Sequence, residues 1–316
     1  AYGGVNVALY DPDCPLFNVV MSRCVYDAKR AENPVYSHLF TAHVDTPEVT
    51  EQTSAPEQAE AEATLEPEQA PTIQLAPPPA VRRHSKVSPT VLHPEIPAEQ
   101  RHNYRIHDDA LGAGTPGEKF NRNIRAIRLL KKLEAEDRFA TSEEQEILAQ
   151  YVGWGGLADC FDERHSKYGE LKALLTEDEY AAARASTLNA HYTTPVVIRA
   201  IYDTLSNMGF QTGNILEPSC GVGNFFGCLP ETMADSKLYG VELDSLTGRI
   251  AQQLYQNASI TVQGYERVNY PKDFFDVAVG NVPFGSYQVN DKAYNRLGFS
   301  IHNYFFAKAL DQVRPG

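Results

Sequence analysis

The chain has 316 residues, of which 42% are hydrophobic and 22% charged, so it is long enough for two ordinary domains with a sizeable core. Its net charge of −13 argues against a protein that is basic overall and coats nucleic acid by charge alone. No apolar run reaches the ~18 residues that a membrane span needs, no signal peptide opens the chain, and its five cysteines form no CxxC pair. We therefore expect a cytoplasmic protein without a metal site and without contact with a membrane.

The first hundred residues divide into two parts. Residues 1–44 show short strand-like patterns at 5–9 and 17–20, which predict a partial small domain of unknown role. Residues 45–100 hold ten of the 20 prolines, and their 10 acids and 3 bases contribute −7 to the net charge. This composition predicts a disordered linker. The remaining 216 residues carry only −5, which leaves room for a local basic surface.

A helical lead-in region is predicted for residues 101–190. Apolar residues recur at helical spacing on one face of the first helix; they are Phe120, Ile124, Ile127 and Leu130. A basic ridge lies beside them and consists of Arg122, Arg125, Arg128 and Lys132. This ridge could contact DNA phosphates, although such a ridge is more often a solvated face. Capping boxes predict two further helices; they pair Ser142 with Gln145 and Thr176 with Glu179.

Residues 191–316 alternate between helical and strand-like patterns. After a helix over 195–207, short apolar strands are predicted at 215–216, 238–241, 260–262 and 277–279. Helical stretches near 224–230, 245–256 and 302–313 separate or follow them. Strands and helices in alternation predict an α/β domain with a doubly wound, Rossmann-like parallel sheet.

Two acidic residues end the first two strands of this sheet. Glu217 precedes a turn with Gly221 and Gly223 that matches neither GxGxxG nor a phosphate loop. An acid beside the positive end of a helix favours a ligand that carries both a cation and an anion, such as a free amino acid group. Glu242 follows 25 residues later, close to the usual position of an acceptor for a ribose diol. Each feature alone is also compatible with an ordinary turn or a solvated carboxylate.

The fourth strand leads into Asn281-Val282-Pro283-Phe284-Gly285. This segment resembles the Asn-Pro-Pro-Tyr/Phe motif of AdoMet-dependent amino-methyltransferases, and residues 217–221 and 191–195 resemble their cofactor motif and the element packed beside it. The order and spacing are similar to those of adenine-N6 DNA methyltransferases. With residues 151–157 and 301–306, the chain further resembles the large methyltransferase-helicase fusion proteins of phages and conjugative elements.

The resemblance implies a site for S-adenosyl-L-methionine (AdoMet). Its methionine part would lie over the turn at 219–223, with Glu217 facing the ammonium group and Thr194 and Pro195 beside the carboxylate. Glu242 would hold the ribose hydroxyls, and Leu243 and Tyr265 would sandwich the cofactor adenine. The implied cofactor residues are Thr194, Pro195, Glu217, Pro218, Ser219, Cys220, Gly221, Gly223, Glu242, Leu243 and Tyr265. Gly264 stands where the family often has an acid, and Glu266 is the candidate replacement.

The resemblance also implies catalytic roles for Asn281, Val282, Pro283 and Phe284. The exocyclic amine of adenine is a poor nucleophile because its lone pair is delocalised into the ring. The side-chain carbonyl of Asn281 and the backbone carbonyl of Val282 would accept its hydrogens, while Phe284 would stack on the flipped base. The nitrogen would then displace S-adenosylhomocysteine directly. Val282 replaces the family's first proline, which keeps the carbonyl but loosens the backbone.

The expected function is therefore AdoMet-dependent methylation of adenine N6 in DNA, with a downstream helicase domain in the same polypeptide as a partner. We expect the sheet to be cut after its fourth strand and helix, and such a piece to be inactive alone. Two alternatives stay open. One is an amino-methyltransferase acting on a protein glutamine or an RNA base, and the other is a non-catalytic nucleic-acid-binding module of a larger fusion, which the departures at Val282 and Gly264 favour.

Overall fold

The computed structural model describes residues 5–11, 14–21, 90–187, 192–285 and 287–315. The chain divides into two units, residues 1–82 and 83–316. In the first unit, β1 (Val5–Asp11) and β2 (Cys14–Met21) pair in antiparallel fashion, with Val5 opposite Met21. The two expected strands are thus present and longer than predicted. The predicted linker up to residue 89 lies outside the described residues.

The described part of the second unit begins within the range predicted as linker. The backbone N–H of Thr90 donates to Ser259 Oγ at 2.8 Å, and the ring of His93 packs edge-on against Phe139 with 4.9 Å between centroids. A short 3-10 turn, Ala98–Gln100, follows. Residues 90–100 therefore contact the folded unit.

A four-stranded parallel sheet forms the centre of this unit. Its strands are β3 (Asn214–Glu217), β4 (Lys237–Glu242), β5 (Ser259–Val262) and β6 (Val277–Ala278), in the order β5-β4-β3-β6. The order runs outward from β3 in both directions, so the topological switch point lies between β3 and β6. The predicted doubly wound, Rossmann-like α/β fold is confirmed.

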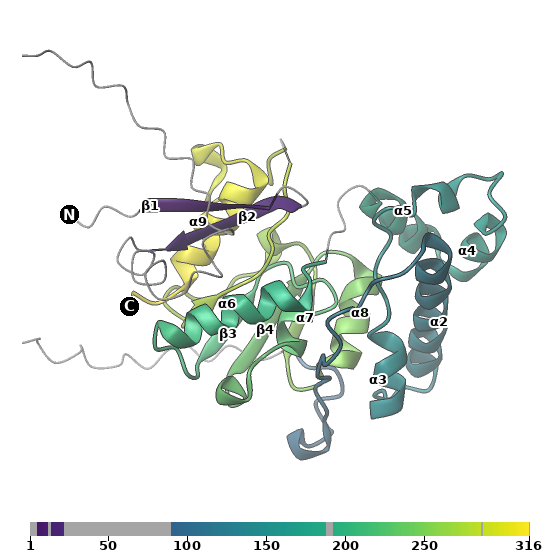
Figure 1. The fold of residues 1–316 in the computed structure, drawn as a ribbon, viewed down its shortest axis with the longest axis horizontal. Coiled ribbons are helices and arrows are strands. Elements are labelled where there is room, and N and C mark those ends of the chain that lie inside the picture. Colours follow the sequence, from purple (N-terminus) through teal and green to yellow (C-terminus); the bar gives the residue numbers. More distant parts are fainter. Residues whose placement is uncertain (1–4, 12–13, 22–89, 188–191, 286, 316) are drawn as a thin grey trace, which may run out of the picture. The chain divides into compact units, whose positions relative to one another are not determined.

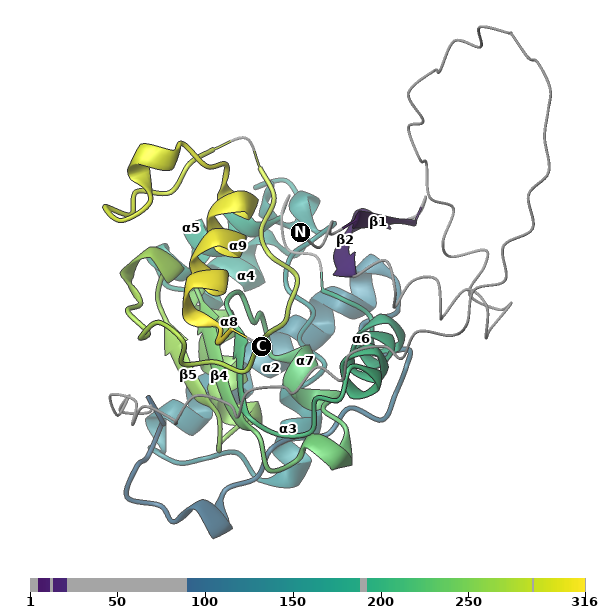
Figure 2. The same cartoon turned by 90° about the vertical axis from the view of Figure 1, so that its left-hand side faces the viewer.

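Helices cover both faces of the sheet, as the two views show (Figure 1 and Figure 2). They are α6 (Pro195–Asn207), α7 (Asn224–Gly227), α8 (Ser245–Leu254) and α9 (Ile301–Gln312). Ile215 belongs to the hydrophobic cluster that contains α6, α7 and α8, whereas its neighbour Leu216 belongs to the cluster that contains α9. Successive strand residues face opposite sides of a sheet, so one short strand supplies both cores.

The described part of the lead-in region contains four α-helices: α2 (Pro116–Ala135), α3 (Ser142–Leu148), α4 (Tyr168–Leu174) and α5 (Glu177–Ser186). The predicted apolar face of α2 is confirmed, because all four of its residues are at most 3% exposed. The predicted capping box at Thr176 is also confirmed. The other box is one residue away from the prediction, since Thr141 pairs with Glu144 and leaves Gln145 free to be buried.

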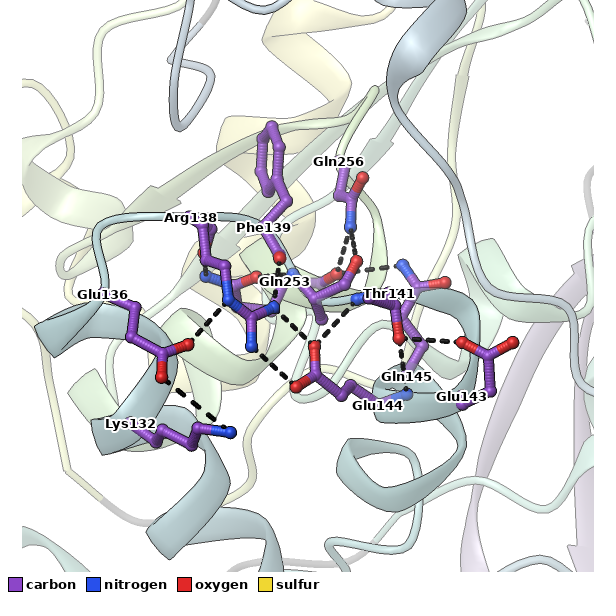
Figure 3. A network of polar contacts seen from close by, with 11 residues as sticks. Lys132, Glu136, Arg138, Phe139, Thr141, Glu143, Glu144, Gln145, Gln253 and Gln256 are labelled. Carbon is purple, nitrogen blue, oxygen red and sulfur yellow. Dashed lines mark hydrogen bonds and ion pairs between the residues drawn. The ribbon is translucent and has the colours of Figure 1, made fainter.

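Buried glutamines join this region to α8 (Figure 3). Gln145 Nε2 donates to the backbone carbonyls of Gln253 and Leu254 at 3.0 and 3.1 Å, and Gln253 Oε1 accepts from the backbone N–H of Ala140 at 2.7 Å. Arg249 of α8 also pairs with Glu134 of α2 at 2.9 Å. Buried amides are stable only when their hydrogen bonds are made. The lead-in helices are therefore an integral part of the same unit as the sheet.

No helix in the described part of the chain is long and apolar enough to cross a membrane.

Candidate cofactor and target-base site

Glu217 is the most deeply buried charge-bearing group at the carboxyl edge of the sheet. Its side chain is 2% exposed, and Oε2 has no hydrogen-bond partner within the described residues. Burial, followed by repulsion from Glu242, raises the pKa of this carboxyl well above its usual range. A buried carboxyl of this kind is stabilised either by a proton or by a cationic ligand. The orphaned oxygen therefore fits the ammonium of an amino acid group.

The backbone around Glu217 is shaped by a glycine. Gly280, which follows β6, has φ +153°, and a Cβ there would lie 3.1 Å from Glu217 Cγ. This is tighter than side chains normally allow, so glycine lets the loop after β6 pass directly over the carboxylate. The end of β3 and the start of the predicted catalytic motif are thereby held together.

The turn after β3 also depends on glycines. Gly221 has φ +55° and Gly223 has φ +82°, a region that favours glycine. A Cβ on Gly221 would lie 2.8 Å from the ring of Tyr192, and one on Gly223 would overlap the ring of Tyr255. Both predicted turn glycines are therefore required by backbone conformation and by their close neighbours.

Glu242 lies at the end of β4, next to this turn. Its Oε2 accepts from the N–H of Gly221 and its Oε1 from the N–H of Asp244, each at 2.8 Å. Burial raises the pKa of Glu242 to about 7 despite these two donors. A carboxylate has about four lone-pair sites, so acceptors remain for ligand hydroxyls. The two strand-end acids thus lie at one edge of the sheet, as predicted, and Gly221 connects the turn to the second of them.

We call residues 219–223 the cofactor turn, after the role that the resemblance implies. This turn is bonded directly to the predicted catalytic motif. Ser219 Oγ donates to the backbone carbonyl of Asn281 at 2.7 Å. Val282 is buried, at 9% exposure, and packs in the cluster under α9. Phe284 is half-buried and stacks on His302 at the start of α9, with 5.7 Å between ring centroids and 22° between planes. The motif and the turn therefore converge, although they are about 60 residues apart in the chain.

The remaining predicted cofactor residues lie around this turn. Thr194 is exposed at the start of α6, and its side chain makes no capping hydrogen bond to that helix. Pro195 is buried at the first helical position. Cys220 is buried, its N–H donates to the carbonyl of Val241 at 2.9 Å, and burial raises the pKa of its thiol. Cys220 therefore packs the turn against β4, whereas the hydroxyl of Thr194 is available to a ligand.

The expected sandwich of Leu243 and Tyr265 is not supported by the packing. Leu243 is 76% exposed and free to cover a ligand. Tyr265, by contrast, is 2% exposed and its ring packs on Phe305, while its hydroxyl donates to Gln312 Oε1 at 2.7 Å. Lys308 Nζ lies 4.9 Å from the same ring. Tyr265 therefore belongs to the core beneath α9. The sequence did not show this, because an aromatic side chain suits a core as well as a ligand platform.

The side chain of Glu266 folds back over Gly264. Its carboxylate is folded so far over Gly264 that a Cβ on this glycine would overlap both carboxylate oxygens. The carboxylate of Glu266 thus occupies the space beside Gly264, and its role as the replacement acid stays a prediction.

Sequence reasoning missed two contacts at the site. The ring of Tyr192 lies between the cofactor turn and the lead-in region, because a Cβ on Gly153 would be 2.9 Å from one edge of the ring and a Cβ on Gly221 2.8 Å from the other. Trp154, next to Gly153 in the sequence, is 1% exposed and belongs to the hydrophobic core. The second missed contact is the stack of His302 on Phe284. Glycines flanking Trp154 and a histidine at a helix start were visible signals, but neither shows its partner.

The chain is similar to two curated proteins. It is 30% identical over 199 residues to the Defense against restriction protein B of Escherichia phage P1, which covers 61% of this chain and 7% of that protein. It is 32% identical over 93 residues to the Type II methyltransferase M.CvrRI of Paramecium bursaria Chlorella virus XZ-6E, which covers 29% of this chain and 23% of that protein. The chain thus spans less than a quarter of the length of either relative.

Among solved structures, a putative class I S-adenosylmethionine-dependent methyltransferase from Listeria monocytogenes is 16% identical with a TM-score of 0.32, over 62% of this chain and 71% of that one. No protein-family model matches the chain. Part of the chain is thus similar to a type II methyltransferase, and the unit that contains this part has a doubly wound sheet.

Proposed function

We propose that residues 118–316 form the AdoMet-binding part of a DNA adenine-N6 methyltransferase. The observation that carries this proposal is the convergence of three elements at one edge of the sheet. These are the buried and unpartnered carboxyl of Glu217, the carboxylate of Glu242 bonded to Gly221, and the bond from Ser219 to Asn281. A cofactor turn is thereby joined to a motif that offers hydrogen-bond acceptors and an aromatic ring.

The donor set at this edge fits AdoMet better than a dinucleotide. Two carboxyls, Glu217 and Glu242, would repel the phosphates of a dinucleotide, whereas AdoMet brings an ammonium group and a ribose diol. Glu217 would hold the ammonium, Glu242 the ribose, and the hydroxyl of Thr194 the carboxylate. When bound, the cofactor supplies an electrophilic methyl group. A cation beside Glu217 would also offset the cost of burying its charged form.

The target amine would be held by the motif after β6. Asn281 and the carbonyl of Val282 accept its two hydrogens and so localise the nitrogen lone pair toward the methyl group. Phe284 already stacks on His302, so a base on its other face would extend that stack. Base stacking on an aromatic ring is worth roughly 1–3 kcal/mol, which offsets much of a flipping cost of a few kcal/mol. The names of both curated relatives, which refer to restriction and to a type II methyltransferase, support DNA as the substrate.

The chemistry can be tested on the full-length polypeptide. It should leave N6-methyladenine in duplex DNA, detected by mass spectrometry of the digested nucleosides. Asn281→Ala should lower the rate by about 10²- to 10⁴-fold, because it removes an acceptor of the reacting amine. Asn303→Ala, an exposed position on α9, is the matched control and should leave the rate unchanged.

Two results would contradict the proposal. Methylated glutamine or RNA with unmodified DNA would favour the other acceptors. Binding of DNA with neither AdoMet binding nor methylation would favour a non-catalytic module. The downstream helicase domain stays a prediction that the sequence beyond residue 316 would test.

A further inference from the structure

The segment between the catalytic motif and α9 forms a closed loop. The N–H of Ile301 donates to the carbonyl of Tyr287 at 3.0 Å, which joins the two ends. Gln288 Nε2 donates to the carbonyl of Gly298 at 3.1 Å, one step further in. We call residues 287–300 the motif loop. Loops of this length with adjoining ends are compact surface features that often carry function.

A buried ion pair fastens the motif loop to α9. Lys308 is 4% exposed, and its Nζ lies 2.9 Å from Asp291 Oδ2. The hydroxyl of Tyr304 donates to the same carboxylate oxygen at 2.8 Å, and Lys308 also donates to the carbonyl of Tyr265 at 2.8 Å. A buried ion pair holds only when its hydrogen bonds are complete, as they are here. The loop is therefore fixed, and the one acid within it is neutralised.

The surface of the motif loop that remains is basic and partly apolar. Lys292 and Arg296 are exposed, and neither forms an ion pair with any other described residue. Tyr287 and Leu297 are 51% and 58% exposed. With Asp291 neutralised by Lys308, the exposed charges of the loop are two cations. Free cations beside exposed apolar side chains suit a partner with phosphates and bases.

The interior of the motif loop is hollow. A cavity of about 250 Å³ opens among its side chains. Its lining includes Gln288, Asn290, Tyr294, Asn295 and Phe299. Amide groups hydrogen-bond base edges and aromatic rings stack on bases. Asn295 Nδ2 already donates to Asn290 Oδ1 at 2.8 Å, whereas Asn290 Nδ2 and Gln288 Oε1 form no hydrogen bond with another described residue. The cavity thus offers these two amide groups and its aromatic rings to an unpaired base.

The basic ridge of α2 differs from the motif loop because most of its cations contact other groups of the protein. Arg128 pairs with Glu170 at 2.9 Å, and Lys132 lies 3.8 Å from Glu136. Arg122 donates to the carbonyl of Ala113 at 2.6 Å. Acids therefore offset the charge of two of the four cations of the ridge, and a third, Arg122, is oriented by a backbone carbonyl, which leaves less net charge for phosphates.

We propose that the motif loop, and not the α2 ridge, is the surface that holds DNA next to the target base. Lys292 and Arg296 contact backbone phosphates, and the cavity receives an unpaired base beside the target. The loop starts directly after the Asn281–Gly285 motif and ends at the helix whose His302 stacks on Phe284, so a strand bound along it passes the catalytic motif. This inference rests on the proposed DNA substrate.

The test compares two double variants with equal loss of charge. Binding of a labelled DNA duplex would be followed by fluorescence anisotropy over a range of salt concentrations, for the wild-type chain, K292A/R296A and R125A/R128A. We expect K292A/R296A to lower the slope of log K against log salt by about 2 and to weaken binding by roughly tenfold to a hundredfold at about 0.1 M salt. We expect R125A/R128A to match the wild type in both quantities.

Calorimetric titration of AdoMet into the same three proteins separates failure of this inference from failure of the proposed function. Unchanged AdoMet affinity in K292A/R296A with weakened DNA binding supports the motif loop. Unchanged DNA binding in this variant, or a loss confined to R125A/R128A, overturns the inference while AdoMet binding is intact. Tighter binding of an RNA duplex than of the DNA duplex also overturns it. Absence of AdoMet binding in the wild type would instead contradict the proposed function.

Discussion

The cofactor turn and the motif loop lie at the same edge of the sheet but are built differently. The turn is held by backbone geometry: Gly221 and Gly223 adopt left-handed conformations against the rings of Tyr192 and Tyr255, and the buried Glu217 and the half-buried Glu242 lie beside them. The motif loop is held by side chains, through Lys308 and Asp291, and keeps its cations exposed. A small invariant ligand suits a preformed and buried site, whereas a DNA strand needs an open, basic surface.

The largest change in stability is expected from a substitution in the cofactor turn. Gly223→Ala should lower the free energy of unfolding by about 2–4 kcal/mol, because the new Cβ combines a strained φ with overlap of the buried Tyr255 ring. Gly156→Ala is the control, since Gly156 has a similar φ of +72° but nothing within 4 Å of its Cβ. It should cost only about 1–2 kcal/mol. Urea unfolding measures both, and equal losses would show that Tyr255 does not restrict the turn.

A smaller change in the free energy of unfolding is expected when the pH is raised. The folded-state pKa of Glu242 is about 7, above its ordinary value of 4.5, so the folded chain retains a proton that the unfolded chain releases. The stability from this proton is fully present below about pH 4.5 and is lost as pH rises toward 7, by at most about 3 kcal/mol. The raised pKa of Glu217 acts in the same direction.

Thermal unfolding between pH 4.5 and 8 checks this expectation. Glu242→Gln should flatten the fall in stability, and Glu231→Gln, at an 85% exposed side chain, should not. Stability that rises with pH across this window in the wild-type chain would contradict the raised pKa values of the two carboxyls.

Much of the fold was predictable because it follows from local pattern. The alternation of apolar runs with helical periods predicts β3 to β6 and α6 to α9 within a few residues, and Pro195 marks the start of α6 as expected. The convergence of Glu217, Glu242 and Asn281 was also predictable, since carboxyl ends of parallel strands share one edge. The shift of the α3 cap arises from a tertiary demand that local pattern does not show, the burial of Gln145 against α8.

The contacts that were missed are those between distant segments. Tyr265 is aromatic at the expected position, but only the packing of α9 shows that its ring is in the core. Tyr192 between Gly153 and Gly221, and Lys308 against Asp291, likewise join segments whose pairing leaves no periodic signal. The residue types therefore predicted which functional groups lie at the edge of the sheet. The contacts that support these groups could be identified only from the structure.

The central claim is that the buried carboxyl of Glu217 receives the ammonium group of AdoMet. Isothermal titration of AdoMet into the wild-type chain and Glu217→Gln tests it most directly, because glutamine keeps the shape and removes the charge. We predict binding by the wild type and a loss of at least about tenfold in affinity for Glu217→Gln, with an unfolding midpoint equal to or above that of the wild type, since the buried ionisable group is gone. Equal affinity of the two proteins for AdoMet, or no binding by the wild type, would contradict the account.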